Sequence, residues 1–355
     1  MPSGTPDPVS GAGSGPTRGI LQVHPTLRCN LRCEHCYSSS GPDVSTALDI
    51  SSLCAALEDA RALGYETVSV SGGEPFLYRE LPELLRFAKS IGLRTGVTSN
   101  GTLFGRDRLQ RVREHLDGLA ISVDGPPDVH NRMRASPRAF ERLLAGVQIA
   151  RDSGIPFAFI HTFTEGGWTH LPWVAELAAQ QGARLLQIHP LEPFGRAQTR
   201  LRADVPAGDT TSRAYLLAKA LEARYACSFA VQFDALLRRD ILADPELVYA
   251  APGDEPPQSR NAADRLGSLV IEADGTVVPI SYGFSASYAV ANLHERGLAE
   301  SWPAWERAHQ ARFRALCRSV FEEISAGDAR LVNWHDLIVA RSNEVRSPAA
   351  ARAAA

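Results

Sequence analysis

The sequence TVSVSGGEP, residues 67–75, decides the fold. Its first half predicts a short β-strand, and the paired glycines and proline that follow predict a turn. Helical sequence flanks this stretch on both sides: SSLCAALEDARALG (51–64) comes before it and ELPELLRFAKSIG (80–92) after it. The first helix ends on Gly64, a residue typical of a helix C-terminal cap. A strand enclosed between two helices in this way is the repeat unit of a parallel α/β sheet.

The same unit recurs along the first half of the chain. Further strand segments are GILQVH (19–24), LRTGVTSNG (93–101), GLAISVDGP (118–126), IPFAFIHTFT (155–164) and ARLLQIHPLEP (183–193). Six units at a spacing of about 25–35 residues are typical of parallel βα architecture. Because such crossovers are right-handed, we predict an α/β fold, a partial (β/α)6 TIM-type barrel with functional loops at the carboxyl ends of its strands.

The pattern changes after about residue 195, and we expect a C-terminal α+β extension there. It contains a predicted hairpin, LGSLVIEADGTVVPI, that turns at Asp274-Gly275, and a predicted tail helix, WPAWERAHQARFRALCRSVFEE. We divide the chain into a disordered lead-in (1–18), a barrel core (19–195), a helical and loop connector with a Pro-rich segment (196–265), the extension (266–345) and a disordered tail (346–355).

Composition excludes several function classes. The formal net charge is −3 with no broad basic field, so we expect no nucleic-acid partner. No apolar run approaches the ~18 residues of a membrane span, and the N-terminus has no secretion signal. We therefore expect a cytoplasmic protein without a membrane partner. Its six cysteines are then expected to be reduced, as ligands or core residues.

Three of the cysteines, Cys29, Cys33 and Cys36, follow the first predicted strand in a C-x3-C-x2-C run. Closely spaced thiolates hold iron–sulfur clusters. Three ligands rather than four leave one iron open, as catalytic metal sites keep a free position. The alternatives are a structural zinc site or a chance group of buried thiols. Zinc sites usually close with four ligands, and the nearby candidates are His24 and His35, of which His35 is flanked by the cysteines themselves.

This run resembles the signature of the radical SAM superfamily, over residues 19–195 and more faintly over 266–300. The resemblance implies one [4Fe–4S] cluster on the three cysteines, with S-adenosylmethionine chelated by the open iron. One electron then cleaves S-adenosylmethionine to a 5′-deoxyadenosyl radical, which takes a hydrogen atom from the substrate. The resemblance also implies an external one-electron reductant of the flavodoxin or ferredoxin type.

Further loops resemble the family's cofactor-binding segments. Gly72, Gly73 and Glu74 match the GGEP turn, whose backbone and carboxylate receive the methionine ammonium of S-adenosylmethionine. The resemblance also implies cofactor contacts by Asn100 in TSNG, by Ser122 and Asp124 in SVDG, and by Arg134 in H-x3-R after His130, where the arginine pairs with the carboxylate of S-adenosylmethionine. Ala135 stands where many relatives have glycine, and we expect this difference to matter little.

The extension resembles a degenerate SPASM/twitch segment. Ile280, directly after Pro279, stands where that segment typically has a cysteine that begins an auxiliary cluster site. A second cluster needs several thiolates. We therefore predict a single cluster and a redox-neutral outcome, such as rearrangement, elimination, epimerisation, radical addition or radical decarboxylation.

The sequence gives weaker evidence for catalytic residues. Cys54, Cys227 and Cys317 are most simply core residues, with Cys54 on the apolar face of its helix. Cys227 or Cys317 is an alternative hydrogen donor to a substrate radical. His161, His189 and Glu192 lie at the ends of the fifth and sixth predicted strands and are expected to face one cavity.

The leading hypothesis is an enzyme acting on a small molecule or a short peptide in a biosynthetic or maturation pathway. Only about 18 residues precede the first strand, which favours a small molecule or a peptide presented by a separate partner. A maturase of ribosomally made peptides is one alternative. A non-catalytic iron–sulfur electron carrier or scaffold is another, and the intact GGEP and SVDG loops disfavour it.

Overall fold

The computed structural model describes residues 19–251 and 261–344. Ten strands form one sheet in the order β11-β10-β9-β1-β2-β3-β4-β5-β6-β7. They are β1 (Ile20–Val23), β2 (Thr67–Val70), β3 (Arg94–Ser99), β4 (Gly118–Ser122), β5 (Phe157–Phe163), β6 (Leu185–Pro190), β7 (Ala230–Phe233), β9 (Ser268–Ile271), β10 (Thr276–Pro279) and β11 (Ala291–Asn292). From β9 to β7 all neighbours are parallel, whereas β10 and β11 are antiparallel. A small second sheet pairs β8 (Leu236–Leu237) with β12 (Leu331–Val332).

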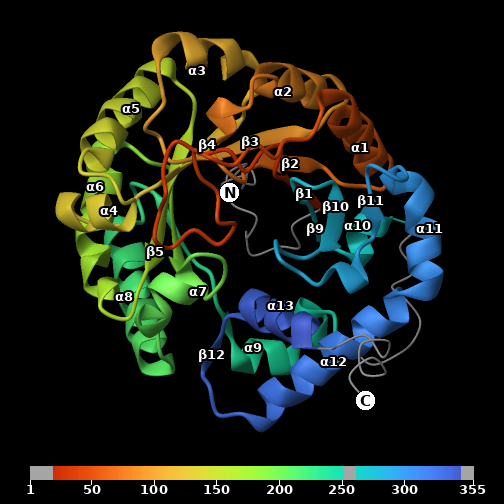
Figure 1. The fold of residues 1–355 in the computed structure, drawn as a ribbon. Coiled ribbons are helices and arrows are strands. Elements are labelled where there is room, and N and C mark those ends of the chain that lie inside the picture. Colours follow the sequence, from red (N-terminus) through yellow and green to blue (C-terminus); the bar gives the residue numbers. More distant parts are fainter. Residues whose placement is uncertain (1–18, 252–260, 345–355) are drawn as a thin grey trace.

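Helices follow most strands and cover the outer face of the curved sheet (Figure 1). The α-helices are α1 (Ile50–Ala62), α2 (Leu81–Ser90), α3 (Arg106–Val112), α4 (Pro127–Met133), α5 (Ala139–Ser153), α6 (Leu171–Gln181), α7 (Ala197–Arg200), α8 (Gly208–Tyr225), α9 (Arg238–Ala243), α10 (Ala262–Arg265), α11 (Leu298–Ala308), α12 (Gln310–Ala326) and α13 (Trp334–Glu344). Short 3-10 helices are η1 (Pro75–Leu77), η2 (Arg113–His115), η3 (Gly167–His170), η4 (Arg202–Asp204), η5 (Pro245–Val248) and η6 (Ala286–Tyr288).

The two faces of the sheet differ in polarity. Side chains of paired residues in a parallel sheet share a face and alternate along each strand. The outer face is apolar and packs against the helices, as Leu21, Val68 and Leu119 show by being fully buried. The inner face is polar and half-buried at Gln22, Ser69, Thr98, Ser122, Thr162, Gln187, His189 and Gln232. The inner, concave face of the curved sheet is therefore polar, and we call the space on this side of the sheet the lumen (Figure 1).

The predicted α/β partial barrel is confirmed, and all six predicted strands exist. The hairpin is also present: Gly275 has a φ of +84°, and Asp274 accepts a hydrogen bond from the backbone of Thr276. The extension does not stand apart from the barrel, because β9 pairs with β1 in the same sheet. Figure 1 shows α9, α12 and α13 in the space between the two ends of the sheet.

Other expectations differ from the structure. The predicted tail helix is two helices, α11 and α12, separated at His309. The connector contains β7, a strand that we did not predict. This strand has only four residues, Ala230–Phe233, and none of them is fully buried. The lead-in 1–18, the tail 346–355 and most of the Pro-rich segment lie outside the described residues. No helix in the described part of the chain combines the length and the apolar character needed to cross a membrane.

Candidate functional site

The three cysteines lie on the cysteine loop, residues 24–49, which joins β1 to α1. The thiols of Cys29 and Cys33 are buried, Cys36 is half-buried, and all three gather around Leu31. The loop is fixed by backbone hydrogen bonds, including one from Cys29 N to Gly41 O (3.1 Å). One short peptide therefore presents three thiols from a defined backbone.

Each thiol has a polar neighbour. The contacts are Asn100 Nδ2 to Cys29 Sγ (3.9 Å), Arg134 Nη1 to Cys33 Sγ (3.7 Å) and Ser38 Oγ with Cys36 Sγ (3.5 Å). Burial raises the pKa of Cys29 to about 12 and also raises the pKa of Cys33, which the guanidinium of Arg134 opposes. Thiols of this kind ionise on binding metal, and hydrogen bonds to the sulfur atoms tune an iron–sulfur cluster.

This arrangement fits an iron–sulfur cluster. Among residues 19–251 and 261–344, no three His, Cys, Asp or Glu side chains converge on the position of a single metal ion. The thiolates of a four-iron cube bind different irons, so they do not need to meet at one point. A buried loop with three thiols and a polar donor at each sulfur supplies what such a cube requires from the protein.

The turn after β2 presses against the cysteine loop. A Cβ atom on Gly73 would lie 2.3 Å from the carbonyl oxygen of Arg28, and Gly72 has a φ of +98°. Only glycine fits at this close approach. Two backbone hydrogen bonds join the segments, from Gly73 to Thr26 (2.8 Å) and from Glu74 to Arg28 (2.9 Å). The glycines thus hold the cluster loop in place, a role that the turn motif alone did not reveal.

Glu74 is fully buried and fastens this turn to the next one. Its carboxylate accepts hydrogen bonds from Ser99 Oγ (2.8 Å), from the backbone of Asn100 (2.9 Å) and from the backbone of Phe76 (3.2 Å). Burial raises the pKa of Glu74, and these three donors oppose that shift. Both carboxylate oxygens therefore already have protein partners, and Glu74 connects the loops that follow β2 and β3.

Asp124 and Arg134 form a buried bidentate ion pair at the end of β4. Arg134 Nε and Nη2 donate to the two carboxylate oxygens at 2.5 and 2.9 Å. The guanidinium holds the pKa of Asp124 well below its usual range although burial acts in the opposite direction. His35 and His130 lie beside this carboxylate, and burial lowers the pKa of each to about 4. Arg134 thus carries its positive charge between Asp124 and the thiol of Cys33.

Two further residues of this rim can now be placed. Ala135, just after α4, has a φ of +48°, the left-handed region in which a side chain costs roughly 1 kcal/mol relative to glycine. This strain explains why glycine suits the position. Ser122 ends β4 on the inner face of the sheet, half-buried.

The segment after β6 clamps the cysteine loop, and the sequence did not reveal it. Arg196 donates from Nε to the carbonyl of Cys33 (2.9 Å), from Nη2 to that of Ser40 (2.6 Å) and from its backbone to that of Cys36 (2.9 Å). A Cβ atom on the preceding Gly195 would lie 2.1 Å from the carbonyl of Tyr37. The sequence feature that could have indicated this contact is a glycine followed by an arginine, Gly195–Arg196, directly after the sixth predicted strand.

His189 and Glu192 line the lumen, whereas His161 does not. His189 pairs with Thr162 on the inner face, and His161 pairs with Ile188 on the outer face. His161 is fully buried there, and its Nδ1 lies 2.9 Å from the carbonyl of Val123. The expectation of one shared cavity is therefore wrong for His161, because adjacent positions on a strand point to opposite faces.

The remaining cysteines lie far from one another. Cys317 is fully buried in α12, where burial raises its pKa well above the usual range. Cys227 is exposed in the turn between α8 and the edge strand β7. Cys54 is half-buried on α1. Of the three cysteines, only Cys317 is a fully buried core residue. Neither Cys227 nor Cys317 is placed to donate a hydrogen atom into the lumen.

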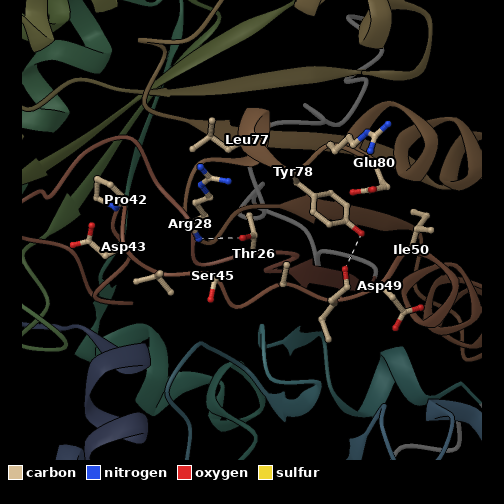
Figure 2. Close-up of a pocket in the computed structure, with 14 residues that line it drawn as sticks. Thr26, Arg28, Pro42, Asp43, Ser45, Asp49, Ile50, Leu77, Tyr78 and Glu80 are labelled. Carbon is tan, nitrogen blue, oxygen red and sulfur yellow. Dashed lines mark hydrogen bonds between the residues drawn. The ribbon is translucent and has the colours of Figure 1, made fainter.

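A groove of about 480 Å³ lies on the other side of the cysteine loop (Figure 2). Its lining comes from the loop, from the start of α1 and from residues 77–80, and contains no residue of the sheet. Figure 2 shows Arg28, the neighbour of Cys29, together with Asp49 and Tyr78, whose hydroxyl donates to Leu48 O (3.0 Å). The groove is thus bounded by the cysteine loop, the start of α1 and residues 77–80.

Aromatic side chains lie near Ile280, the position at which the related extension has a cysteine of its auxiliary cluster site. Ile280 has a φ of +67°, an uncommon value for a β-branched residue. The turn it makes brings Tyr282 onto the ring of His24, with centroids 4.9 Å apart, and edge-on to Tyr37 at 5.2 Å. The hairpin therefore packs aromatic side chains, rather than a thiol, next to the cysteine loop.

The fold and the site define an iron–sulfur protein of the partial-barrel class. Residues 23–172 match the family model of the radical SAM superfamily. The match covers 150 of the 355 residues, so this part of the chain is similar to the superfamily, whose members are enzymes that use a [4Fe–4S] cluster and S-adenosylmethionine.

Similar proteins include both small-molecule and peptide enzymes. The chain is 23% identical to Fe-coproporphyrin III synthase of Methanosarcina barkeri over 290 residues, covering 78% of this chain and 71% of that protein. It is 29% identical to PqqA peptide cyclase of Ruegeria pomeroyi over 261 residues, covering 72% and 65%. Matches to three AdoMet-dependent heme synthases span only 50 to 55% of those proteins.

The structure of anSMEcpe with bound AdoMet and the Cp18Cys peptide has a similar fold. The TM-score is 0.62 at 17% identity, and the superposition covers 94% of this chain and 98% of that one. At this identity the likeness concerns the fold alone.

Proposed function

We propose that this enzyme reductively cleaves S-adenosylmethionine with a cluster held by Cys29, Cys33 and Cys36, and that the resulting 5′-deoxyadenosyl radical takes a hydrogen atom from a substrate bound in the lumen. One observation carries the proposal: the three thiols have polar neighbours from separate elements, with Asn100 after β3 and Arg134 after β4. The cluster supplies the electron that breaks the carbon–sulfur bond.

The chain's own residues would position the cofactor. We propose that the Gly72–Gly73 backbone, Asn100 and Ser122 contact S-adenosylmethionine. Arg134, whose Nη1 is not engaged by Asp124, would meet the cofactor's carboxylate. Glu74 and Asp124 already have protein partners, so they would act by holding the turn and the guanidinium.

We propose two substrate classes, a polar small molecule and a peptide. A polar small molecule suits the polar lumen, and a peptide is the second candidate, since PqqA peptide cyclase is similar to the chain. We also propose a single cluster and a redox-neutral reaction. The separation of Cys54, Cys227 and Cys317 on different elements supports the single cluster, since an auxiliary site needs several thiolates together.

An external reductant of the flavodoxin or ferredoxin type would supply the electron in the cytoplasm. The groove beside the cysteine loop carries charges of both signs, Arg28 and Arg79 together with Asp43, Asp49 and Glu80. Within it, exposed Arg28 is next to Cys29 and is the contact we propose for a carboxylate of the reductant. We expect Arg28→Glu to slow reduction by flavodoxin several-fold at low salt and to leave reduction by dithionite unchanged. Arg239→Glu, an exposed substitution on α9, is the matched control. Equal slowing by both variants would contradict a site at this groove.

The experiment for the main proposal is anaerobic. The reconstituted protein is incubated with S-adenosylmethionine and dithionite, and 5′-deoxyadenosine is measured. Candidate deuterated substrates, including short peptides, are then tested for deuterium transfer into 5′-deoxyadenosine. Absence of 5′-deoxyadenosine from a preparation with about four irons per chain would overturn the proposed function, and clearly more than four would overturn the single cluster.

A further inference from the structure

A cluster of charged side chains lies at the carboxyl ends of β6 and β7, on the lumen side of the sheet. We call His189, Glu192, Asp234 and Asp336 the histidine–carboxylate cluster. His189 is at the end of β6, Glu192 follows it, Asp234 follows β7 and Asp336 is in the first turn of α13. Four separate positions along the chain thus contribute to one place.

The imidazole of His189 lies between two carboxylates. Its Nδ1 is 3.0 Å from Asp234 Oδ2 and its Nε2 is 2.9 Å from Glu192 Oε1. The side chains are 27%, 16% and 19% exposed for His189, Asp234 and Glu192 respectively, so they border the lumen and are not sealed in the core. Asp234 is further held by Gln187 (2.6 Å) and Gln232 (2.8 Å). The imidazole therefore carries a proton and bridges two carboxylates.

Asp336 adds a third carboxyl group. It shares a side-chain hydrogen bond with Glu192, and burial together with the charge of Glu192 raises the pKa of Asp336. In the described part of the chain, Oδ1 of Asp336 and Oε1 of Gln232 are buried acceptors without a hydrogen-bond partner. Buried polar atoms without partners are unusual in folded proteins. The cluster thus has acceptor atoms that a ligand's donors would satisfy.

The cluster lies close to the cysteine loop. Glu192 lies three residues before Gly195, where a Cβ atom would lie 2.1 Å from the carbonyl oxygen of Tyr37. The next residue, Arg196, donates from its backbone to the carbonyl of Cys36 (2.9 Å), so the segment that carries Glu192 touches the loop beside the third ligand. A ligand held by Glu192 would lie near the place where the radical forms.

We propose that the histidine–carboxylate cluster is a substrate-binding subsite that takes a cationic amino group. Three carboxyl groups surround one imidazole, and with one proton shared between Glu192 and Asp336 the cluster keeps one net negative charge. An ammonium group would offset this charge and donate to the acceptors without partners. Desolvation lowers the pKa of His335, the neighbour of Asp336 in the chain, so this imidazole is neutral at pH 7 and does not cancel the charge.

The inference rests on the proposed function and names its substrate chemistry. A lysine side chain of a peptide and a small-molecule amine share this chemistry. Uncharged polar groups on the inner face, Gln22, Ser69 and Thr98, suit the remainder of either ligand.

The test uses matched probes on the reconstituted enzyme. Dissociation constants are measured by ligand-observed NMR for n-pentylammonium, n-pentanol and hexanoate, and for Nα-acetyl-lysine-N-methylamide against Nα-acetyl-norleucine-N-methylamide. We expect each cation to bind about 10-fold more tightly than its neutral match, with hexanoate weakest, because a charged hydrogen bond favours the cation. Tighter binding of the lysine derivative than of pentylammonium indicates a peptide source, and the reverse indicates a small amine.

Two variants locate the site. Glu192→Gln and Asp336→Asn should each remove the preference for the cations, whereas Glu222→Gln, which deletes an exposed carboxylate on α8, should preserve it. Equal binding of cations and neutral matches, or a preference that survives both cluster variants, would overturn the proposal. Release of 5′-deoxyadenosine by the wild-type preparation is measured in parallel, so failure of the subsite is distinguished from failure of the proposed function.

Discussion

Two walls of the lumen are built in different ways. The wall formed by β1 to β4 carries the cysteine loop and is held by contacts between turns that follow neighbouring strands, as between Glu74 and Ser99. The wall formed by β6, β7 and α13 gathers His189, Asp234 and Asp336 from distant parts of the chain. Under the proposed function, the first wall would hold the cluster and the cofactor in a fixed arrangement, and the second wall would contact the substrate.

The largest effect is expected at the first wall. Cys36→Ala removes one of three ligands, so we expect loss of the cluster and of 5′-deoxyadenosine release to background. Iron content, visible absorbance and product are measured after anaerobic reconstitution. Cys227→Ala, at the exposed thiol, should retain all three. Full iron content in Cys36→Ala would show that the ligand assignment is wrong.

The next effect concerns the buried ion pair. Arg134→Ala leaves the fully buried Asp124 without its bidentate partner, and we expect a loss of about 3–5 kcal/mol in the free energy of unfolding. Chemical denaturation at neutral pH measures the loss. The double variant Asp124→Asn/Arg134→Gln removes both charges and should be less destabilised than the single one. A loss as small as that of a surface ion pair would refute the structural role given to this pair.

The clamp at Arg196 links the second wall to the first. Arg196→Ala removes two hydrogen bonds to carbonyls of the cysteine loop, and we expect a loss of about 1–3 kcal/mol together with faster iron release to a chelator. Arg196→Lys should restore part of the iron retention. Arg202→Ala, six residues further on and exposed, is the control. Iron release as slow as in the control would show that the clamp has no influence on the cluster.

The smallest effect is a pH dependence of the second wall. Burial, and then Glu192, raise the pKa of Asp336 to about 9, so the folded chain keeps a proton that the unfolded chain has lost above about pH 4. This contribution to stability is complete below the unfolded pKa and is lost as pH rises through the folded one. Stability should therefore fall between pH 6 and 9 by at most about 1.4 kcal/mol per pH unit.

The variant Asp336→Asn should flatten this slope, as measured by denaturation at pH 6, 7, 8 and 9. Asp152→Asn, an exposed control on α5, should leave it unchanged. An identical slope in Asp336→Asn and the wild-type protein would mean that Asp336 is ionised in the folded state.

The first wall was largely predictable from the sequence, because its residues occur in short runs at the ends of consecutive strands. The backbone role of Gly73 and the buried position of Glu74 were not, since they depend on how closely two turns approach. The second wall was only partly predictable. His189 and Glu192 were named, but Asp234 and Asp336 follow a short strand and begin a distant helix, without a motif to mark them.

His161 illustrates a different limit. Its position near a strand end suggested the lumen, yet its pairing with Ile188 assigns it to the helix-facing side. If the alternation along a strand is assigned one residue out of step, every side chain is placed on the wrong face of the sheet. The sequence of residues 155–164 alone did not determine which residues face the lumen.

The position of β1 has a consequence for how the chain folds. Ile20 pairs with Thr67 on one side and with Ser268 on the other, so the strand that leads into the cysteine loop is complete only when residues 268–271, far along the chain, have joined it. Such pairing between distant segments is formed slowly, because closing the intervening chain costs entropy before the contact is made. Cluster insertion during biogenesis would then follow, rather than precede, synthesis of the C-terminal hairpin.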